Sequence, residues 1–243
     1  MRNLLSWARA LLIFWPYIFL VTVTLEPISL LAGVLDKSGR ARHTVVKLWS
    51  AIILKVVTRA TVSGLERIDA SKPRLYVANH LSAMDIPLLY RHLPFPFRIM
   101  AHRLVFRVPL IGWWLRSSGA LEIEPGNFAL TRRALREAIK TLQRGMSLVV
   151  FPEGERAPRG KMLPFRRGAF YVAVKAQADI VPMAILGTYE ALPLGSVHIR
   201  RVALQFVVGD PIAAAEYTLK DLDALAEHAQ SVVRKMYEAA GSR

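Results

Sequence analysis

Residues 74–85 read RLYVANHLSAMD, and the interpretation of the whole chain starts from this stretch. Its first five residues are mostly apolar, and a short apolar run bounded by polar residues is typical of a buried strand. A polar cluster follows at once, with His80 and Asp85 as its titratable members. In open α/β sheets, binding sites lie at the carboxyl ends of strands. The stretch therefore predicts a strand that delivers a histidine and an aspartate to a functional edge.

Beyond about residue 60 the chain alternates strand-like runs with helical stretches. This alternation predicts an α/β fold with a mostly parallel sheet flanked by helices. We find no internal repeat, low-complexity tract or long linker that would divide it. The expected strands are 60–64, 75–78, 97–101, 121–124, 147–151, 180–186 and 202–208. The expected helices are 129–144, closed by Gly145, then 168–178 and 219–240.

His80 and Asp85 suit general base chemistry. A histidine near neutral pKa accepts a proton from an alcohol, and a carboxylate holds its tautomer and stabilises the imidazolium. On one continuous helix the two side chains would lie roughly 140° apart, so a turn must intervene. Ser82 and Pro87 are helix-start signals that allow such a turn. The alternative is structural: Ser82-x-x-Asp85 is also a capping-box pattern, in which the aspartate only starts a helix.

A second polar motif follows the apolar run at 147–150. Residues 151–156 read FPEGER, and the chain continues as APRGKMLPFRRGAF. Five basic residues lie within the twelve positions from Arg156 to Arg167. A glycine-bearing turn rich in guanidinium groups, leading into a helix, predicts a phosphate cradle. A solvated basic loop without substrate selection is the alternative.

The apolar excess lies at the front of the chain. Residues 10–25 carry no charge, Glu26 and Pro27 interrupt the run, and residues 28–35 resume it. Sixteen residues fall short of the ~20 that span a bilayer. Basic residues flank both sides, so charge sets no crossing direction. We expect a helical hairpin or two short helices dipping into one leaflet; a single tilted spanning helix and a cleaved signal peptide are the alternatives.

Residues 45–65 continue the apolar theme with helical spacing. The expected stripe is Val45, Leu48, Trp49, Ile52, Ile53, Val56 and Val57, with basic residues off it. Such a helix either lies on a membrane surface or packs its stripe on the rest of the protein.

Composition narrows the classes of partner. The 243 residues carry a net charge of +15, 53% are hydrophobic, and there is no cysteine. The absence of cysteine excludes disulfides, Cys-ligated zinc and a thiol acyl-enzyme. High charge with high hydrophobicity indicates a folded protein that meets an anionic surface. We find no aromatic stacking platform or reading helix for nucleic acid, and the six histidines show no metal-ligand spacing, so no metal is expected.

Four ordered motifs together resemble a known family. They are N-H-x4-D, then F-P-E-G-x-R with Glu153 lying 73 positions after His80, then L-P-F-R-x-G-A-F, then I-V-P-M-A-I. This set resembles the glycerolipid acyltransferases, and most closely the bacterial 1-acyl-sn-glycerol-3-phosphate acyltransferase family. The resemblance covers residues 62–212, and it implies an α/β acyltransferase domain at 61–243 behind membrane-anchoring helices at 1–60.

The resemblance also implies an activity and its residues. His80 is expected to be the general base for the sn-2 hydroxyl of lysophosphatidate, oriented by Asp85, and the product is phosphatidic acid. The hydroxyl attacks the thioester of acyl-CoA or acyl carrier protein directly, so no cofactor is needed. The expected location is the cytoplasmic face of the inner membrane, monotopic or with a single N-terminal anchor. The residues expected to bind the acceptor phosphate are Glu153, Gly154, Arg156, Arg103 and Arg166.

Two positions depart from the family pattern. In the family a further block, G-x-x-x-I-x, is followed by arginine, whereas here residues 119–124 (GALEIE) are followed by Pro125. Glu155 replaces the threonine of E-G-T-R. Neither change touches the histidine–aspartate pair, but both alter the charge expected around the acceptor headgroup. The alternatives are therefore the same chemistry on another lysolipid, or a lipid-surface protein without catalysis.

Overall fold

The computed structural model describes residues 7–57, 59–124, 126–158 and 161–242. Within these residues a single seven-stranded sheet has the order β1-β7-β6-β2-β5-β3-β4. Every strand-like run of the sequence carries one of its strands. These are β1 (Ala60–Ser63), β2 (Leu75–Ala78), β3 (Phe97–His102), β4 (Leu121–Ile123), β5 (Ser147–Val150), β6 (Ile180–Leu186) and β7 (Leu204–Val208).

The sheet is mostly parallel, as predicted. Only β6 and β7 pair antiparallel among the described strands, and the other pairs are parallel. Every residue of the central strands β2, β5 and β6 is buried. Burial on both faces explains why these strands read as continuous apolar runs rather than alternating ones.

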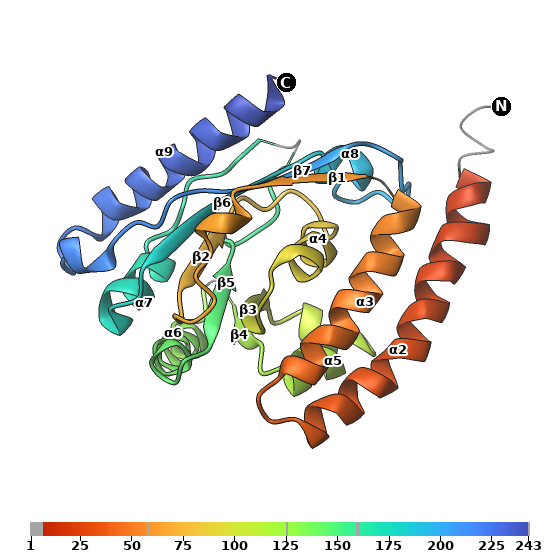
Figure 1. Ribbon diagram of the computed structural model, residues 1–243, viewed down its shortest axis with the longest axis horizontal. Coiled ribbons are helices and arrows are strands. Elements are labelled where there is room, and N and C mark those ends of the chain that lie inside the picture. Colours follow the sequence, from red (N-terminus) through yellow and green to blue (C-terminus); the bar gives the residue numbers. More distant parts are fainter. Residues whose placement is uncertain (1–6, 58, 125, 159–160, 243) are drawn as a thin grey trace.

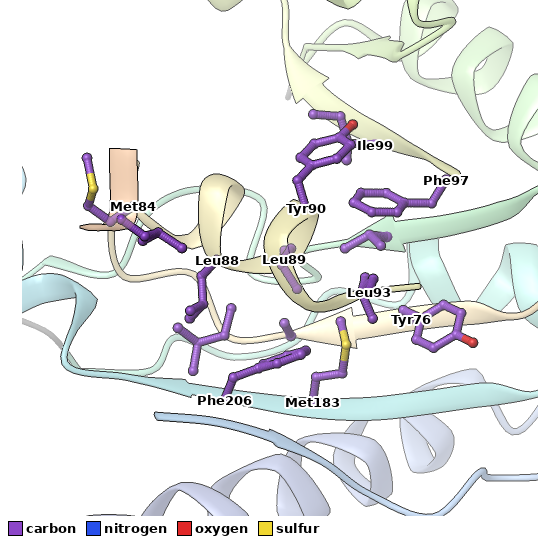
Figure 2. Close-up of a cluster of buried hydrophobic side chains, with 14 of the residues drawn as sticks. Tyr76, Met84, Leu88, Leu89, Tyr90, Leu93, Phe97, Ile99, Met183 and Phe206 are labelled. Carbon is purple, nitrogen blue, oxygen red and sulfur yellow. The ribbon is translucent and has the colours of Figure 1, made fainter. Parts of the chain in front are cut away.

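Helices cover both faces of the sheet (Figure 1). On one face Leu88 and Leu89 of α4 (Asp85–His92), with Leu93 directly after the helix, pack over Tyr76, Met183 and Phe206 of the sheet (Figure 2). The other face is covered by α6 (Phe128–Gln143), α7 (Gly168–Ala176) and α9 (Leu222–Gly241). The short helices α5 (Ile111–Ser117) and α8 (Thr188–Ala191) follow β3 and β6.

The long helix at the front of the chain is continuous. A π-helical turn, η1 (Ala10–Phe14), leads into α2 (Trp15–Leu35), which runs through Pro27. The expected break at residues 26 and 27 is therefore wrong. An interior proline costs a helix about 3 kcal/mol, but α2 packs along α3 (Arg40–Val57), and tertiary packing supplies most helix stability.

The helix α3 packs on the α/β body with a stripe that agrees only in part with the one expected from the sequence. Of the expected residues Ile53 is buried, but Leu48 is 52% exposed. The buried side contacts α4 and consists of His43, Val46, Ser50, Ile53 and Leu54. Which residues of α3 are buried depends on the surface it packs against, and the local sequence does not specify that surface.

Candidate active site

His80 and Asp85 meet at the carboxyl end of β2. The Nδ1 atom of His80 lies 2.7 Å from Asp85 Oδ2; the aspartate is fully buried and the histidine side chain is 18% exposed. The strand ends at Ala78 and α4 begins at Asp85, so a turn separates the two residues. Because they do not share a helix, the five-residue spacing does not hold them apart. The structure thus contains the turn that the pair requires.

The carboxylate of Asp85 also organises the turn itself. Its Oδ2 atom accepts the backbone N–H groups of Leu81 at 2.8 Å and Ser82 at 3.0 Å. The Ser82 hydroxyl accepts the Met84 N–H at 3.2 Å and donates to the Leu192 carbonyl at 2.7 Å. The helix-start role weighed from the sequence is therefore present together with the contact to the imidazole. One buried oxygen both shapes the turn and holds the histidine.

Glu153 joins the two sequence motifs. It follows β5, the parallel neighbour of β2, and is 1% exposed. Its Oε1 accepts the His80 N–H at 2.7 Å, and its Oε2 accepts the Leu163 N–H at 2.7 Å. Both oxygens are therefore engaged with backbone donors. These contacts favour a positioning role for Glu153 over the phosphate contact that the resemblance implies.

Burial shifts the protonation of this glutamate. Desolvation raises the pKa of Glu153 to about 7, against the hydrogen bonds from the Leu163 and His80 N–H groups, which lower it. Burial disfavours the charged form of a carboxyl group, and hydrogen bonds to the carboxylate favour it. The carboxyl that supports the histidine backbone therefore titrates near neutral pH.

Two further residues position the histidine, and the sequence analysis assigned neither of them a role. The ring of Phe151 stacks on the His80 ring with centroids 4.0 Å apart and an interplanar angle of 15°. The Asn79 amide bridges to β6: its Nδ2 donates to the Ile185 carbonyl and its Oδ1 accepts the Ile185 N–H, both at 2.8 Å. The sequence signal for these roles was that Asn79 directly precedes His80 in the first motif and Phe151 directly precedes Pro152 in the second.

The expected phosphate-binding residues extend along the same edge. Arg103 follows β3, and the loop with Gly154, Arg156 and Arg166 follows β5, which pairs with both β2 and β3. Neighbouring strands lie ~4.8 Å apart, so these groups line one side of His80. Arg156 is exposed, and Gly154 has φ +79°, a conformation that favours glycine. Pro125 lies outside the described residues.

Two cations of this edge, Arg103 and Arg166, are already paired with acidic side chains. Arg103 contacts Glu122 at 3.3 Å and Glu124 at 3.1 Å, and its hydrogen bond lowers the pKa of Glu124 below the ordinary value. Arg166 contacts Glu155 at 3.4 Å, and both side chains are more than half exposed. The edge is thus a mixed-charge surface rather than a purely cationic cradle. In the described part of the chain, no three metal-ligating side chains gather in one place.

A histidine paired with a buried carboxylate at the carboxyl edge of a mostly parallel sheet is an arrangement that can accept a proton from a hydroxyl group. The Acyltransferase family model matches residues 59–186, more than half of the chain. The chain therefore belongs to the Acyltransferase family. The matched range contains the pair and the whole loop after β5 up to Arg166.

Known proteins support this assignment. The chain is 34% identical over 197 residues to a 1-acyl-sn-glycerol-3-phosphate acyltransferase of Chlamydomonas reinhardtii, covering 79% of this chain and 59% of that protein. It is 32% identical to the chloroplastic enzyme LPAT1 of Arabidopsis thaliana, covering 63% of this chain and 43% of that protein. The chain thus spans about half the length of these relatives.

A solved structure shares the fold. The crystal structure of PlsC, the 1-acyl-sn-glycerophosphate (LPA) acyltransferase from Thermotoga maritima, matches with a TM-score of 0.84 and 24% sequence identity. The match covers 100% of this chain and 99% of that chain. It includes the α2–α3 hairpin as well as the sheet, and so supports the whole architecture described above.

Proposed function

We propose that this chain transfers a fatty acyl group from acyl-CoA or acyl carrier protein to the sn-2 hydroxyl of 1-acyl-sn-glycerol-3-phosphate, giving phosphatidic acid. The observation that carries the proposal is the His80–Asp85 contact of 2.7 Å at the edge of β2. The family model covers the contact, and so does the match to the Chlamydomonas reinhardtii relative that bears the name of this activity, since it takes in 79% of this chain.

The geometry defines how the base works. The ionised Asp85 carboxylate only accepts hydrogen bonds, so the Nδ1 atom of His80 carries the proton between them and Nε2 is left to accept one. Nε2 takes the proton of the acceptor hydroxyl as its oxygen attacks the thioester carbonyl. The C–O bond forms, the C–S bond breaks, and the imidazolium returns its proton to the leaving thiolate. The chain supplies no nucleophile of its own.

The N-terminal hairpin supports a location on a membrane. In the described part of the chain, one helix, Trp7–Leu35, is long and apolar enough to cross a membrane, and 6% of its most apolar window is buried. One of its polar groups faces α3: Thr22 accepts the Trp49 indole N–H at 3.0 Å. Its apolar side chains face outward, as in Phe19 at 64% and Leu35 at 76% exposure. This inverted arrangement suits lipid.

We place the hairpin in the cytoplasmic leaflet of the inner membrane. There it serves as a monotopic anchor or, if tilted across the bilayer, as a single spanning one. The net charge of +15 suits a surface of anionic lipid and an acidic carrier protein as donor partner.

A second candidate is the same reaction on a different lysolipid. The specific observation in its favour is that Arg103 and Arg166 each contact carboxylates, and that Glu155 is one of them. A headgroup carrying both a negative and a positive group would match such paired charges better than a phosphate monoester does. The two candidates share the base and differ only in the acceptor.

The test is acyl transfer by the detergent-solubilised full chain. Lysophosphatidate is compared with lysophosphatidylethanolamine, lysophosphatidylcholine and an ornithine-containing lysolipid, each with acyl-CoA and with acyl carrier protein as donor. The His80→Ala variant is expected to lose roughly 10²- to 10⁴-fold in rate. His228→Ala, which changes an exposed histidine on α9, is the matched control and keeps full activity.

Transfer to lysophosphatidate that depends on His80 supports the first candidate. Transfer confined to another lysolipid supports the second and reassigns the acceptor. No transfer to any acceptor by folded protein contradicts both and leaves a lipid-binding protein without catalysis.

A further inference from the structure

An exposed apolar loop lies beside the proposed site. Residues 104–113, here called the apolar loop, follow Arg103 at the carboxyl end of β3. Five large hydrophobic side chains within these ten residues are exposed, against the usual scattering of single ones on a protein surface. They are Leu104 at 58%, Val105 at 37%, Val108 at 43%, Ile111 at 44% and Trp113 at 59%.

The apolar loop is held in a defined shape. Phe106 points inward and is 4% exposed, and the Arg116 guanidinium donates to its carbonyl at 2.7 Å. A Cβ atom on Gly112 would lie 2.1 Å from that same carbonyl oxygen, so the two segments touch closely. Leu110 has φ +64° and ψ −57°, with an Ile111 N–H to Pro109 carbonyl bond of 2.7 Å. This strained three-residue turn persists only where surrounding contacts hold it.

The apolar loop continues the apolar surface of the N-terminal hairpin. Its last three residues form the start of α5, which packs against α2 and lies beside the lower ends of α2 and α3 in Figure 1. The Arg42 guanidinium of α3 donates to the Ser117 carbonyl at the end of α5. Near that end of α2, Leu31 and Leu35 are 58% and 76% exposed. The two apolar surfaces therefore belong to connected parts of one framework.

The residues of the apolar loop suit a lipid headgroup region. The loop contains Trp113 and several aliphatic side chains, with Arg107 among them. Arg103 and Arg116 lie on either side of it in the sequence. Tryptophan favours the membrane interface, and arginine near it adds attraction to anionic lipid. The connection to the outward apolar face of α2 favours contact with lipid over contact with a second protein chain.

We propose that the apolar loop is a second membrane contact, which enters the headgroup and acyl boundary of an anionic bilayer beside the catalytic edge. The inference rests on the membrane location given under the proposed function and adds a residue-level contact to it. One contact through the hairpin leaves the α/β body able to rotate about the anchor. Two contacts separated along the molecule fix which edge of the sheet faces the lipid.

The chain contains no cysteine, which makes the test direct. Single variants Val108→Cys, Leu31→Cys and Phe128→Cys of the full chain are each labelled with an environment-sensitive nitrobenzoxadiazole dye. Emission is recorded with vesicles of phosphatidylglycerol and phosphatidylethanolamine, with and without brominated acyl chains. Phe128 is the matched control, because it is 89% exposed but lies on α6, on the other face of the sheet.

The expected result is a blue shift and bromine quenching at positions 108 and 31, and neither at position 128. Trp113→Cys is a second position in the apolar loop and is expected to match 108. A shift at 31 without one at 108 or 113 overturns the second contact and leaves the anchor intact. Absence of a shift at positions 31, 108 and 113 overturns both the second contact and the membrane anchor. A shift at 108 that needs no vesicles and grows with protein concentration assigns the loop to contact between two copies instead.

A loss-of-contact variant tests the same inference from the other side. Replacing Leu104 and Val108 together by serine removes two apolar side chains from the contact. The vesicle affinity of the full chain should fall roughly tenfold or more. Phe128→Ser is expected to leave it unchanged. Equal affinities for the double variant and this control contradict the proposal.

Discussion

The two halves of the proposed site are built in opposite ways. The base is held from all sides: Asp85 is fully buried, Glu153 is 1% exposed, and hydrogen bonds of 2.7 to 3.0 Å connect them to His80 and the adjoining backbone. Further along the edge, the side chains of Arg103 and Arg166 are 42% and 55% exposed, and each contacts a neighbouring carboxylate at 3.1 to 3.4 Å. Chemistry and acceptor choice thus depend on regions of very different rigidity.

This difference separates what the fold determines from what single residues adjust. Buried polar groups are costly unless every partner is in place, so the base can change little without loss of the turn. Exposed ion pairs contribute only about 0.2–1 kcal/mol, so acidic or basic residues can be exchanged there at small cost in stability. Glu155 in place of a threonine is a change of that second kind.

Asp85→Asn tests the rigid half and has the largest expected effect. The amide of asparagine is uncharged, so its oxygen accepts these hydrogen bonds more weakly than Oδ2 does now, and its NH2 group would donate instead of accepting them. It also allows the wrong histidine tautomer. We expect kcat to fall about 10²- to 10⁴-fold with little change in KM. Initial rates with saturating acceptor measure it, and a circular dichroism spectrum like that of the unchanged chain excludes unfolding. A change confined to KM would contradict the assignment of the chemistry to the buried half and of acceptor binding to the exposed half.

Glu153→Gln has an intermediate effect that depends on pH. Glutamine places one N–H group against a backbone N–H, so we expect kcat to fall roughly tenfold and stability to drop. The folded-state pKa of Glu153, about 7, lies above its ordinary value of 4.5. The folded state therefore binds more protons between these values, and this group's contribution to stability decreases as pH rises through that window.

The variant lacks this titration, so the difference in Tm between the two proteins should narrow from pH 5 to pH 8. Thermal unfolding followed at both pH values measures the difference. A gap that widens with pH would show that Glu153 stays ionised throughout, and that its hydrogen bonds outweigh its burial.

Glu155→Gln tests the exposed half and has the smallest expected effect. It frees Arg166 from an exposed ion pair, so that the guanidinium is available to the acceptor phosphate. The free energy of such a pair corresponds to a KM for lysophosphatidate lower by about 1.5- to 5-fold, and kcat should not change. The gain should fade in high salt because the interaction is screened. Glu137→Gln is the matched control, since its pair with Lys140 is equally exposed but lies on α6. A KM that rises would show that Glu155 itself recognises the acceptor.

Local patterns in the chain were sufficient for most of the fold. Continuous apolar runs predicted the buried strands, and Asn127 caps α6 while Gly145, at φ +87°, ends it close to the expected place. The H-x4-D spacing predicted the pair and its need for a turn. The helix break at Pro27 was wrong because packing along α3, which a local rule does not contain, offsets the proline.

The sequence by itself determined the parallel α/β class, the pairing of His80 with Asp85, and the apolar front, because each is written in residues close together along the chain. Tertiary structure alone decided that Glu153 supports the His80 backbone from 73 positions away, that Arg103 meets two glutamates, and that the apolar loop adjoins α2. The physical reason is that these contacts depend on strand order and helix packing. Both are settled by burial across the whole chain, and no short stretch of residues specifies them.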